Sequence, residues 1–240
     1  MAKIKSGDLV MFFYNDSKKW LLKISKKEQF HSHIGVIKHA DAIGKEFGSR
    51  LVTNKDKYVY LLKPTIHDHV MKMQHSTQIV YPKDFGYIAA RMGVQSGQKI
   101  VEIGTGSGSL TTFLASIVNP RGHVYTFDVE PKFMEIAEKN IKKAGMSKYV
   151  TMHEVNLKKS KKMPLEDMDL AICPTMNQLE KLSMAFVENE FTDIECTEHI
   201  LRRIEAREGK TRHSYQGIGH TTYLAIARKV HFNKKRVKKK

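Results

Sequence analysis

The segment Lys99–Leu110, KIVEIGTGSGSL, joins a short apolar run to three closely spaced glycines. Ile100, Val101 and Ile103 are typical of a buried strand. The three glycines are Gly104, Gly106 and Gly108. They allow a sharp turn in which the backbone approaches a ligand without an intervening Cβ atom. A strand, a glycine loop and a helix start in this order predict a nucleotide-type binding loop.

The glycine spacing and two acidic residues narrow the choice of ligand. The spacing is GxGxG, and the third glycine of a dinucleotide-binding fingerprint is replaced by Ser109, which disfavours NAD and FAD. Glu102 precedes the loop, and Asp128 ends the next predicted strand, where a carboxylate can accept hydrogen bonds from a ribose diol. This combination favours S-adenosylmethionine. A glycine turn that serves only helix packing is the alternative.

The charge of the chain indicates a polyanionic partner. There are 41 Lys and Arg residues against 25 Asp and Glu residues, a formal net charge of +16. Such an excess is self-repulsive unless a polyanion neutralises it, so nucleic acid is the first candidate partner. Two lysine-rich tracts, residues 158–162 and 233–240, are suited to sequence-independent phosphate contacts. A surface that serves solubility or thermal adaptation is the alternative.

Several classes of protein are disfavoured. No apolar run approaches the roughly 20 residues of a membrane span, and the N-terminal segment lacks the apolar stretch of a signal peptide. We therefore expect a cytoplasmic protein without membrane contact. Cys173 and Cys196 lack zinc-ligand spacing, and His31, His33 and His39 lie in strand-like sequence without an acidic or thiol partner. We therefore expect no metal site, and we interpret these histidines as polar surface or RNA contacts.

The elements that must position these residues fall into two parts. Residues 1–63 alternate apolar and polar side chains between turns, which predicts a small, barrel-like β domain. Residues 64–230 alternate strands with amphipathic helices, which is typical of an open α/β sheet, and residues 231–240 form a basic tail. In the second part we expect strands at residues 99–103, 123–128, 149–155, 169–173, 194–204 and 222–228, and helices at 66–73, 85–92, 110–117, 131–141 and 176–189.

Further segments carry a family resemblance. They are Gln78–Asp84 (QIVYPKD), Glu102–Ser109, Pro174–Gln178 and Gly219–Thr221, with Gly35–Ile37 and Ile43-Gly44 in the β domain. On these segments the chain resembles, over nearly its whole length, the S-adenosylmethionine-dependent tRNA (adenine-N1)-methyltransferases that modify the T-loop adenine. The resemblance implies a Rossmann-like class I methyltransferase sheet, tRNA as the partner and a homo-oligomer, namely a tetramer. The implied reaction, at adenine 58, is an attack of adenine N1 on the sulfonium methyl group of S-adenosylmethionine, which depends above all on positioning.

The same resemblance implies roles for individual residues. Gln78 and Tyr81 would close the cofactor pocket, and the Tyr81 ring could also stack on the target base. The amino-acid end of the cofactor would be lined by Glu102, Gly104, Gly106 and Ser107. Thr105 and Gly108 of the same loop would also bind the cofactor. Asp128 would bind the ribose and Asn156 the adenine. An amide stands at 156 where the family more often has an acid, and because its oxygen still accepts a hydrogen bond we expect weaker binding rather than its loss.

The chain departs from the family pattern at the catalytic acid. The family places an aspartate in an Asp-Leu-x-x-Pro-Trp-like loop after the fourth strand, where it stabilises the developing positive charge. That loop is absent here: the single tryptophan is Trp20, and Asp169–Ile172 runs directly into Cys173-Pro174. The residues between Val155 and Met176 are expected to hold one strand, where the family's sheet needs two strands and a helix. We therefore expect the sheet to be one βα unit short, with Asp169 as the remaining candidate acid.

Two other functions remain open on the sequence. The missing aspartate loop is compatible with a non-catalytic RNA- or cofactor-binding paralogue that acts in a mixed oligomer, although the intact glycine loop opposes it. A protein isoaspartyl methyltransferase would share the fold. The closing segment Gly219–Thr221 and the high positive charge disfavour that second alternative.

Overall fold

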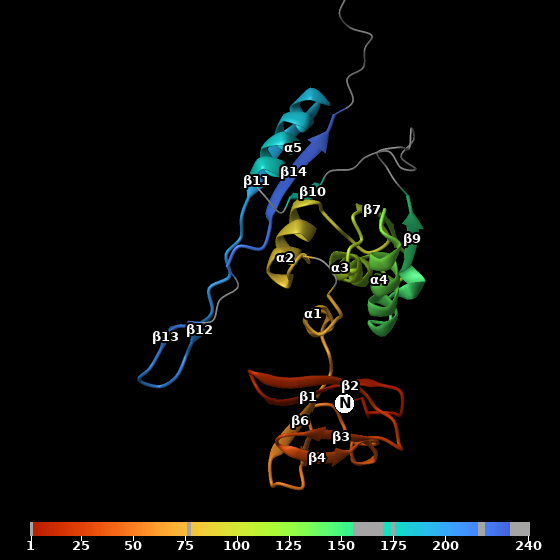
Figure 1. Ribbon diagram of the computed structural model, residues 1–240, viewed down its shortest axis with the longest axis vertical. Helices are drawn as coiled ribbons and strands as arrows, with labels where there is room; N and C mark the ends of the chain where they lie inside the picture. Colours follow the sequence, from red (N-terminus) through yellow and green to blue (C-terminus); the bar gives the residue numbers. More distant parts are fainter. Residues whose placement is uncertain (1, 76–77, 156–169, 174–175, 216–218, 231–240) are drawn as a thin grey trace, which may run out of the picture. The chain divides into compact units, whose positions relative to one another are not determined.

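The chain folds as two compact units, residues Met1–Gln74 and His75–Lys240. The computed structural model describes residues 2–75, 78–155, 170–173, 176–215 and 219–230 (Figure 1). The first unit extends beyond the expected β domain because it includes α1 (Ile66–Met71), a short helix capped by Thr65. Lys19 Nζ lies 3.8 Å from Asp68 Oδ1 and so links this helix to the strands.

The N-terminal unit is built from antiparallel strands, as the alternating sequence predicts. A four-stranded sheet has the order β2-β1-β6-β5, and a hairpin pairs β3 with β4. These strands are β1 (Leu9–Asn15), β2 (Lys18–Lys23), β3 (Gln29–Ser32), β4 (Gly35–Lys38), β5 (Arg50–Val52) and β6 (Tyr58–Leu62), with a 3-10 turn at His39–Asp41. The expected small β domain is therefore present in this part of the chain.

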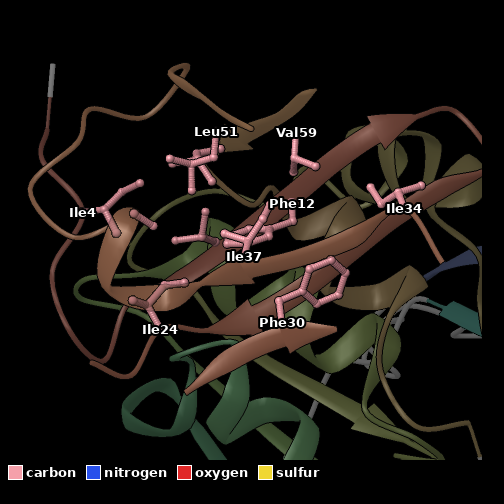
Figure 2. Packing of buried hydrophobic residues seen from close by; sticks show 11 residues of the cluster. Ile4, Phe12, Ile24, Phe30, Ile34, Ile37, Leu51 and Val59 are labelled. Carbon is pink, nitrogen blue, oxygen red and sulfur yellow. The ribbon is translucent and has the colours of Figure 1, made fainter. Parts of the chain in front are cut away.

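Side chains from the sheet and the hairpin share one apolar core (Figure 2). Phe12 of β1 and Phe30 of β3 meet edge to face with ring centroids 5.6 Å apart. Val59 and Leu61 of β6 are fully buried in the same cluster. Since successive side chains of a strand point to opposite faces, the residues that alternate with Val59 and Leu61 lie on the outward face of the sheet.

Gly35 allows the turn between β5 and β6 to fasten onto the β3–β4 hairpin. Thr53 Oγ1 donates to the carbonyl of Ile34 at 2.7 Å, and Asn54 Oδ1 accepts from the amide of Val36 at 2.8 Å. Gly35 has φ +117°, and a Cβ atom there would lie 2.5 Å from Asn54 Oδ1. Only glycine fits this close approach.

The C-terminal unit begins as a parallel βαβαβ arrangement. The strands β7 (Lys99–Ile103), β8 (His123–Asp128) and β9 (Val150–Glu154) pair in parallel in the order β7-β8-β9, joined by α3 (Ser109–Val118) and α4 (Pro131–Lys143). Parallel strands with helical crossovers are the arrangement that the alternating strand and helix patterns predict. The α/β class expected from the sequence is confirmed.

The rest of this unit is antiparallel. The strands β10 (Leu170–Cys173), β11 (Phe191–Thr197) and β14 (Tyr223–Lys229) form a sheet in the order β10-β14-β11, beside which α5 (Met176–Glu188) packs (Figure 1). A separate hairpin pairs β12 (Ile204–Glu205) with β13 (Arg212–His213). The single strand expected at 194–204 is therefore wrong: β11 ends at Thr197, and Ile204 belongs to the hairpin. Both segments contain apolar residues, which favours the prediction of one continuous strand.

Helix α2 (Pro82–Arg91) links the parallel strands to the antiparallel sheet. On one side, Phe85 stacks on Phe113 of α3 with ring centroids 4.4 Å apart. On the other side, Tyr87 donates a hydrogen bond to Glu195 of β11, and Arg91 Nε contacts the same carboxylate at 2.6 Å. In the described part of the chain, β7 pairs only with β8 and β10 only with β14, so side-chain contacts such as these connect the two sheets. The helix begins three residues before the expected position 85 because Pro82 occupies its first turn.

Substitution of Gly35 tests the fastening of the β5–β6 turn. Gly35→Ala should lower the free energy of unfolding by about 1–3 kcal/mol more than Gly48→Ala, because overpacking adds to the backbone cost. Gly48 is a matched control: it also has positive φ, +94°, but a Cβ atom there would meet nothing within 4 Å. Urea unfolding of the full chain measures both values, and equal destabilisation would contradict the close approach.

Candidate cofactor pocket and active site

The glycine loop lies between β7 and α3, at the carboxyl end of the parallel strands. All three glycines have positive φ: +88° at Gly104, +52° at Gly106 and +78° at Gly108. A Cβ atom at Gly108 would lie 3.3 Å from Ala137 Cβ, so this glycine lets α3 start close to α4. A Cβ atom at Gly104 would have no neighbour within 4 Å. Gly108 thus serves packing, while Gly104 leaves room for a ligand at the backbone.

Asp128 holds the loop in this shape. Its Oδ2 accepts a hydrogen bond from the amide of Gly106 at 2.9 Å, and its Oδ1 accepts from the amides of Val129 and Glu130 at 2.8 and 3.1 Å. Asp128 is half-buried at the end of β8. The carboxylate expected to bind a ribose therefore lies directly against the glycine loop and shapes it.

Two exposed apolar residues lie at the carboxyl ends of β7 and β8. Ile103, the last residue of β7, is 46% exposed, and Val129, directly after β8, is 59% exposed. Ligands of open α/β sheets bind outside the carboxyl ends of the strands, which is where both residues lie. Sequence reasoning missed them as pocket residues, since Ile103 was assigned to a buried strand and Val129 to no element. The signal was their position directly before the glycine loop and directly after Asp128.

Glu102 faces the interior of the sheet. Its Oε2 accepts hydrogen bonds from the hydroxyls of Thr111 and, at 2.7 Å, Thr126. Thr105 Oγ1 lies 2.7 Å from Thr126 Oγ1, which extends the network to the glycine loop. Burial raises the pKa of Glu102 to about 7, despite the two hydroxyl hydrogen bonds that favour its charged form. The structure thus places Glu102 as a tie between β7, β8, α3 and the loop; a direct contact with the cofactor stays a prediction.

The loop is also connected to the segment that precedes α2. Ser109 Oγ donates to the carbonyl of Val80 at 2.6 Å, and Asn140 Nδ2 donates to the carbonyl of Ser107 at 2.9 Å. Gln78 Nε2 donates to the carbonyl of Thr221 at 3.1 Å. Three segments that lie far apart in the sequence, and that all carry the family resemblance, are therefore brought together.

A buried ion pair follows Tyr81, the residue that caps α2. Asp84 is fully buried, and Lys83 Nζ lies 2.9 and 3.0 Å from its two carboxylate oxygens. His199 Nδ1 lies 3.3 Å from the same carboxylate, and Lys83 Nζ also donates to the carbonyl of His199 at 2.7 Å. Sequence reasoning placed Lys83 and Asp84 within the motif but assigned them no role, since nothing local identifies His199 as their partner.

Other predicted residues lie elsewhere. Asn156 and Asp169, together with both lysine tracts, fall outside the described residues. His33 Nε2 lies 3.1 Å from Lys18 Nζ, and His39 Nδ1 accepts from the amide of Ser25 at 3.3 Å. Among the residues that the structure describes, no group of three or more His, Cys, Asp or Glu side chains could hold a metal ion, and no helix is long and apolar enough to cross a membrane.

A separate cavity of about 540 Å³ lies between α4 and β9. Its lining residues are Pro131, Met134, Glu135, Glu138, Ile141, Ser147, Val150, Met152 and Glu154. None of the predicted cofactor residues lines it. The glycine loop therefore remains the better candidate for the cofactor site. It offers open backbone at Gly104 and the carboxylate of Asp128, and this chemistry rather than its volume identifies it.

Comparison with known proteins places this site in context. The sequence model of the family described as "tRNA methyltransferase complex GCD14 subunit" matches residues 57–162. The tRNA (adenine(57)-N(1)/adenine(58)-N(1))-methyltransferase TrmI of Methanocaldococcus jannaschii is 29% identical over 261 aligned positions, which cover 88% of this chain and 91% of the relative. The tRNA (adenine(58)-N(1))-methyltransferase catalytic subunit TRM61 of Cryptococcus neoformans is 34% identical over 152 positions, 62% of this chain but only 35% of that protein.

Solved structures agree. The tRNA (m1A58) methyltransferase TrmI from Aquifex aeolicus has 27% sequence identity and a TM-score of 0.80, over 96% of this chain and all of that one. The chain is thus similar, over nearly its whole length, to S-adenosylmethionine-dependent tRNA (adenine-N1)-methyltransferases. A second structure, described as a SAM-dependent O-methyltransferase from Thermotoga maritima, has 28% identity and a TM-score of 0.88 over 96% of both chains. The class I methyltransferase fold predicted from the sequence is confirmed, and these similarities support the predicted family.

The alignment with the Methanocaldococcus protein contains unmatched residues. The 261 positions aligned with the Methanocaldococcus protein exceed the 88% of this chain that they contain. That relative therefore carries residues without a counterpart here. The expected loss of a βα unit stays a prediction, because the coverage figures do not locate these residues and residues 156–169 lie outside the described part of the chain.

Glu102 should give the free energy of unfolding a characteristic pH dependence. Because its pKa is raised from 4.5 to about 7 in the folded chain, the folded state binds more protons than the unfolded state between these values. Stability should therefore fall as the pH rises from 4.5 to 7, by about 3 kcal/mol in total, and level off above pH 7. Glu102→Gln should abolish this part of the pH dependence.

Urea unfolding between pH 4.5 and 8 measures the effect as the difference between the wild-type chain and the variant. Glu138→Gln, on the exposed face of α4, is the control for removal of one negative charge. A Glu102→Gln profile parallel to the wild-type profile over the whole range would rule out the raised pKa.

Proposed function

We propose that this chain transfers a methyl group from S-adenosylmethionine to N1 of the T-loop adenine, adenine 58, of tRNA. The observation that carries the proposal is the glycine loop held by Asp128 at the carboxyl ends of β7 and β8, in a chain similar to tRNA (adenine-N1)-methyltransferases. The loop geometry and the similarity to these relatives support the proposal without reference to charge. The net charge of +16 is a further, independent support, since it suits a polyanionic substrate.

The residues at the loop fit S-adenosylmethionine. The open backbone at Gly104 allows close approach, and the carboxylate of Asp128 can accept from the ribose hydroxyls. Ile103 and Val129 provide exposed apolar surface at the carboxyl ends of β7 and β8. When bound, S-adenosylmethionine supplies an electrophilic methyl group. Asn156 is assigned to its adenine, and Thr105, Ser107 and Glu102 to the loop side of the pocket.

The protein's part in the reaction is to position the base and to balance charge. Gln78 is tied to the carbonyl of Thr221, and Tyr81 stands at the start of α2, next to the fully buried Asp84. These contacts fix the segment that closes the pocket, where the ring of Tyr81 stacks on the extruded adenine. Asp169, the remaining candidate acid outside the family's aspartate loop, partly stabilises the positive charge that develops on the base.

The two alternatives receive less support. The relatives from Methanocaldococcus, Cryptococcus and Aquifex are tRNA methyltransferases by name, which disfavours a protein isoaspartyl methyltransferase. A non-catalytic paralogue that binds only RNA would not need the cofactor pocket to be kept. An assembly of several subunits, expected from the resemblance as a homotetramer, is part of this proposal; the Cryptococcus relative is itself named a catalytic subunit.

Calorimetric titration of S-adenosylmethionine into the full chain tests the pocket. Asp128→Ala should weaken binding at least tenfold, because it removes the ribose acceptor and releases the amide of Gly106. Gly106→Val should do the same, since a β-branched residue is strained at φ +52°. Glu138→Ala should bind like the wild type. No heat of binding at millimolar cofactor, or full binding by both pocket variants, would overturn the assignment.

A methyl-transfer assay on a T-loop tRNA transcript tests the chemistry. Loss of one preorganised charge-stabilising group typically costs a factor of about 10² to 10³ in rate, so transfer should be slow relative to relatives that keep the aspartate loop, while binding persists. Asp169→Asn should lower the rate at least tenfold further without weakening cofactor binding. If Asp169→Asn transfers at the wild-type rate, another residue fills the role.

A further inference from the structure

The outward face of the N-terminal sheet carries an ordered row of basic and aromatic side chains. The strand register pairs Phe13 of β1 with Lys19 of β2 on one side and with Tyr60 of β6 on the other. Tyr60 is paired in turn with Arg50 of β5. Directly paired residues of antiparallel strands place their side chains on the same face. The row across the sheet is therefore basic, aromatic, aromatic and basic.

The β5–β6 end of this face is exposed although it is apolar. Tyr58 and Tyr60 are 49% and 42% exposed, and Val52, which is paired with Tyr58, is 54% exposed. The guanidinium carbon of Arg50 lies 4.4 Å from the ring centroid of Tyr58. The four residues Arg50, Val52, Tyr58 and Tyr60 are here called the tyrosine face. Adjacent exposed aromatic residues are typical of a binding surface rather than of a chance surface composition.

The tyrosine face is held rigidly from below. Val59 and Leu61, which alternate with the tyrosines, are fully buried in the core. The turn that joins the two strands is fixed by the hydrogen bonds of Thr53 and Asn54 to the β3–β4 hairpin. A surface ordered in advance loses less conformational entropy when a ligand binds. Binding at this face would not require the sheet to rearrange.

The charges around the face suit a nucleic acid. Residues 1–74 contain 14 Lys and Arg residues but only 7 Asp and Glu residues. Lys57 and Lys63, both exposed, stand at the two ends of β6. Asp56 in the adjoining turn is the nearest acid in sequence, and Asp68 contacts Lys19 at 3.8 Å. A face meant for an apolar protein surface would need fewer charges around it, since interface cores are depleted of them.

We propose that the tyrosine face binds unpaired bases of the RNA substrate by stacking, as a contact separate from the methyl-transfer pocket. Tyr58 and Tyr60 lie two residues apart on one strand, so their rings are spaced by roughly 7 Å and can each receive a base. Sheets that present exposed aromatic residues stack bases of single-stranded RNA, and neighbouring cations contact the backbone. The inference rests on the proposed function in that tRNA supplies the RNA.

Fluorescence anisotropy with the full chain tests this inference, with a labelled tRNA transcript and a labelled, fully paired RNA duplex as probes. Tyr60→Leu should weaken tRNA binding by about 5- to 100-fold, because a stacked base is worth about 1–3 kcal/mol. Tyr60→Phe keeps the ring and should bind like the wild type. The log–log dependence of tRNA affinity on salt should keep its slope in both variants, since no phosphate contact is lost.

Arg50→Gln is the matched electrostatic variant. It should weaken tRNA binding with a salt slope shallower by about 1, the signature of one lost phosphate contact. Duplex binding should be unaffected by Tyr60→Leu, because paired bases are not available for stacking. Thermal unfolding confirms that each variant is folded before its affinity is read.

Three outcomes are decisive. Wild-type tRNA affinity in a folded Tyr60→Leu chain would overturn the inference, as would an equal loss with Tyr60→Phe. A change in the sedimentation coefficient of the Tyr60→Leu chain with unchanged RNA affinity would also overturn it and would identify the face as a protein interface.

Methyl transfer separates this inference from the proposed function. A chain that binds RNA through Tyr60 but transfers no methyl group refutes only the proposed function. Normal transfer with unaltered binding by Tyr60→Leu refutes only the tyrosine face.

Discussion

The buried carboxylate of Asp84 is the constraint on which the C-terminal unit depends. An ionised carboxylate removed from water is very costly unless cations and hydrogen-bond donors surround it, and here Lys83 and His199 do so. Lys83 belongs to α2, whereas His199 follows β11, so the pair holds the start of the helix against the antiparallel sheet. Phe85 of the same helix turn stacks on Phe113 of α3. The parallel and antiparallel sheets share no strand pairing in the described part of the chain. The placement of one sheet against the other therefore depends on the contacts of α2.

Local patterns were sufficient to predict most elements, because each pattern reports the burial of its own segment. The glycine loop, the strand that ends at Asp128 and the helix that begins near Pro131 are all present. Contacts between distant segments were not predictable in this way: nothing near Gln78 indicates the carbonyl of Thr221, and nothing near Asp84 indicates His199. The orientation of Glu102 was not predictable for the same reason. The hydroxyls of Thr111 and Thr126, which donate hydrogen bonds to its carboxylate, come from a helix and a neighbouring strand.

Asp128 builds the glycine loop and, in the proposed function, also binds the ligand of that loop. Its two oxygens already accept three backbone amides, one from the glycine loop and two from the residues after β8. A carboxylate has about four lone-pair sites, so acceptor capacity remains for a ribose hydroxyl. Because the loop amide of Gly106 and the ribose would share this carboxylate, the shape of the loop and the affinity for the cofactor are linked at a single residue.

The distribution of charge fits the two ligands of the proposed function, which have opposite character. The polyanionic tRNA is served by an excess of lysine and arginine over the chain as a whole, whereas the sulfonium of the cofactor is cationic. Acidic residues accordingly gather at the carboxyl ends of the parallel strands, with Asp128 at the end of β8, Glu130 close behind it and Glu154 at the end of β9. A basic pocket would repel the sulfonium and attract phosphate to the wrong place. In the proposed function, this local reversal of sign would let one chain bind both ligands. Burial raises the pKa of Glu102 to about 7, so at lower pH this interior carboxyl is neutral and the negative charge lies at the strand ends.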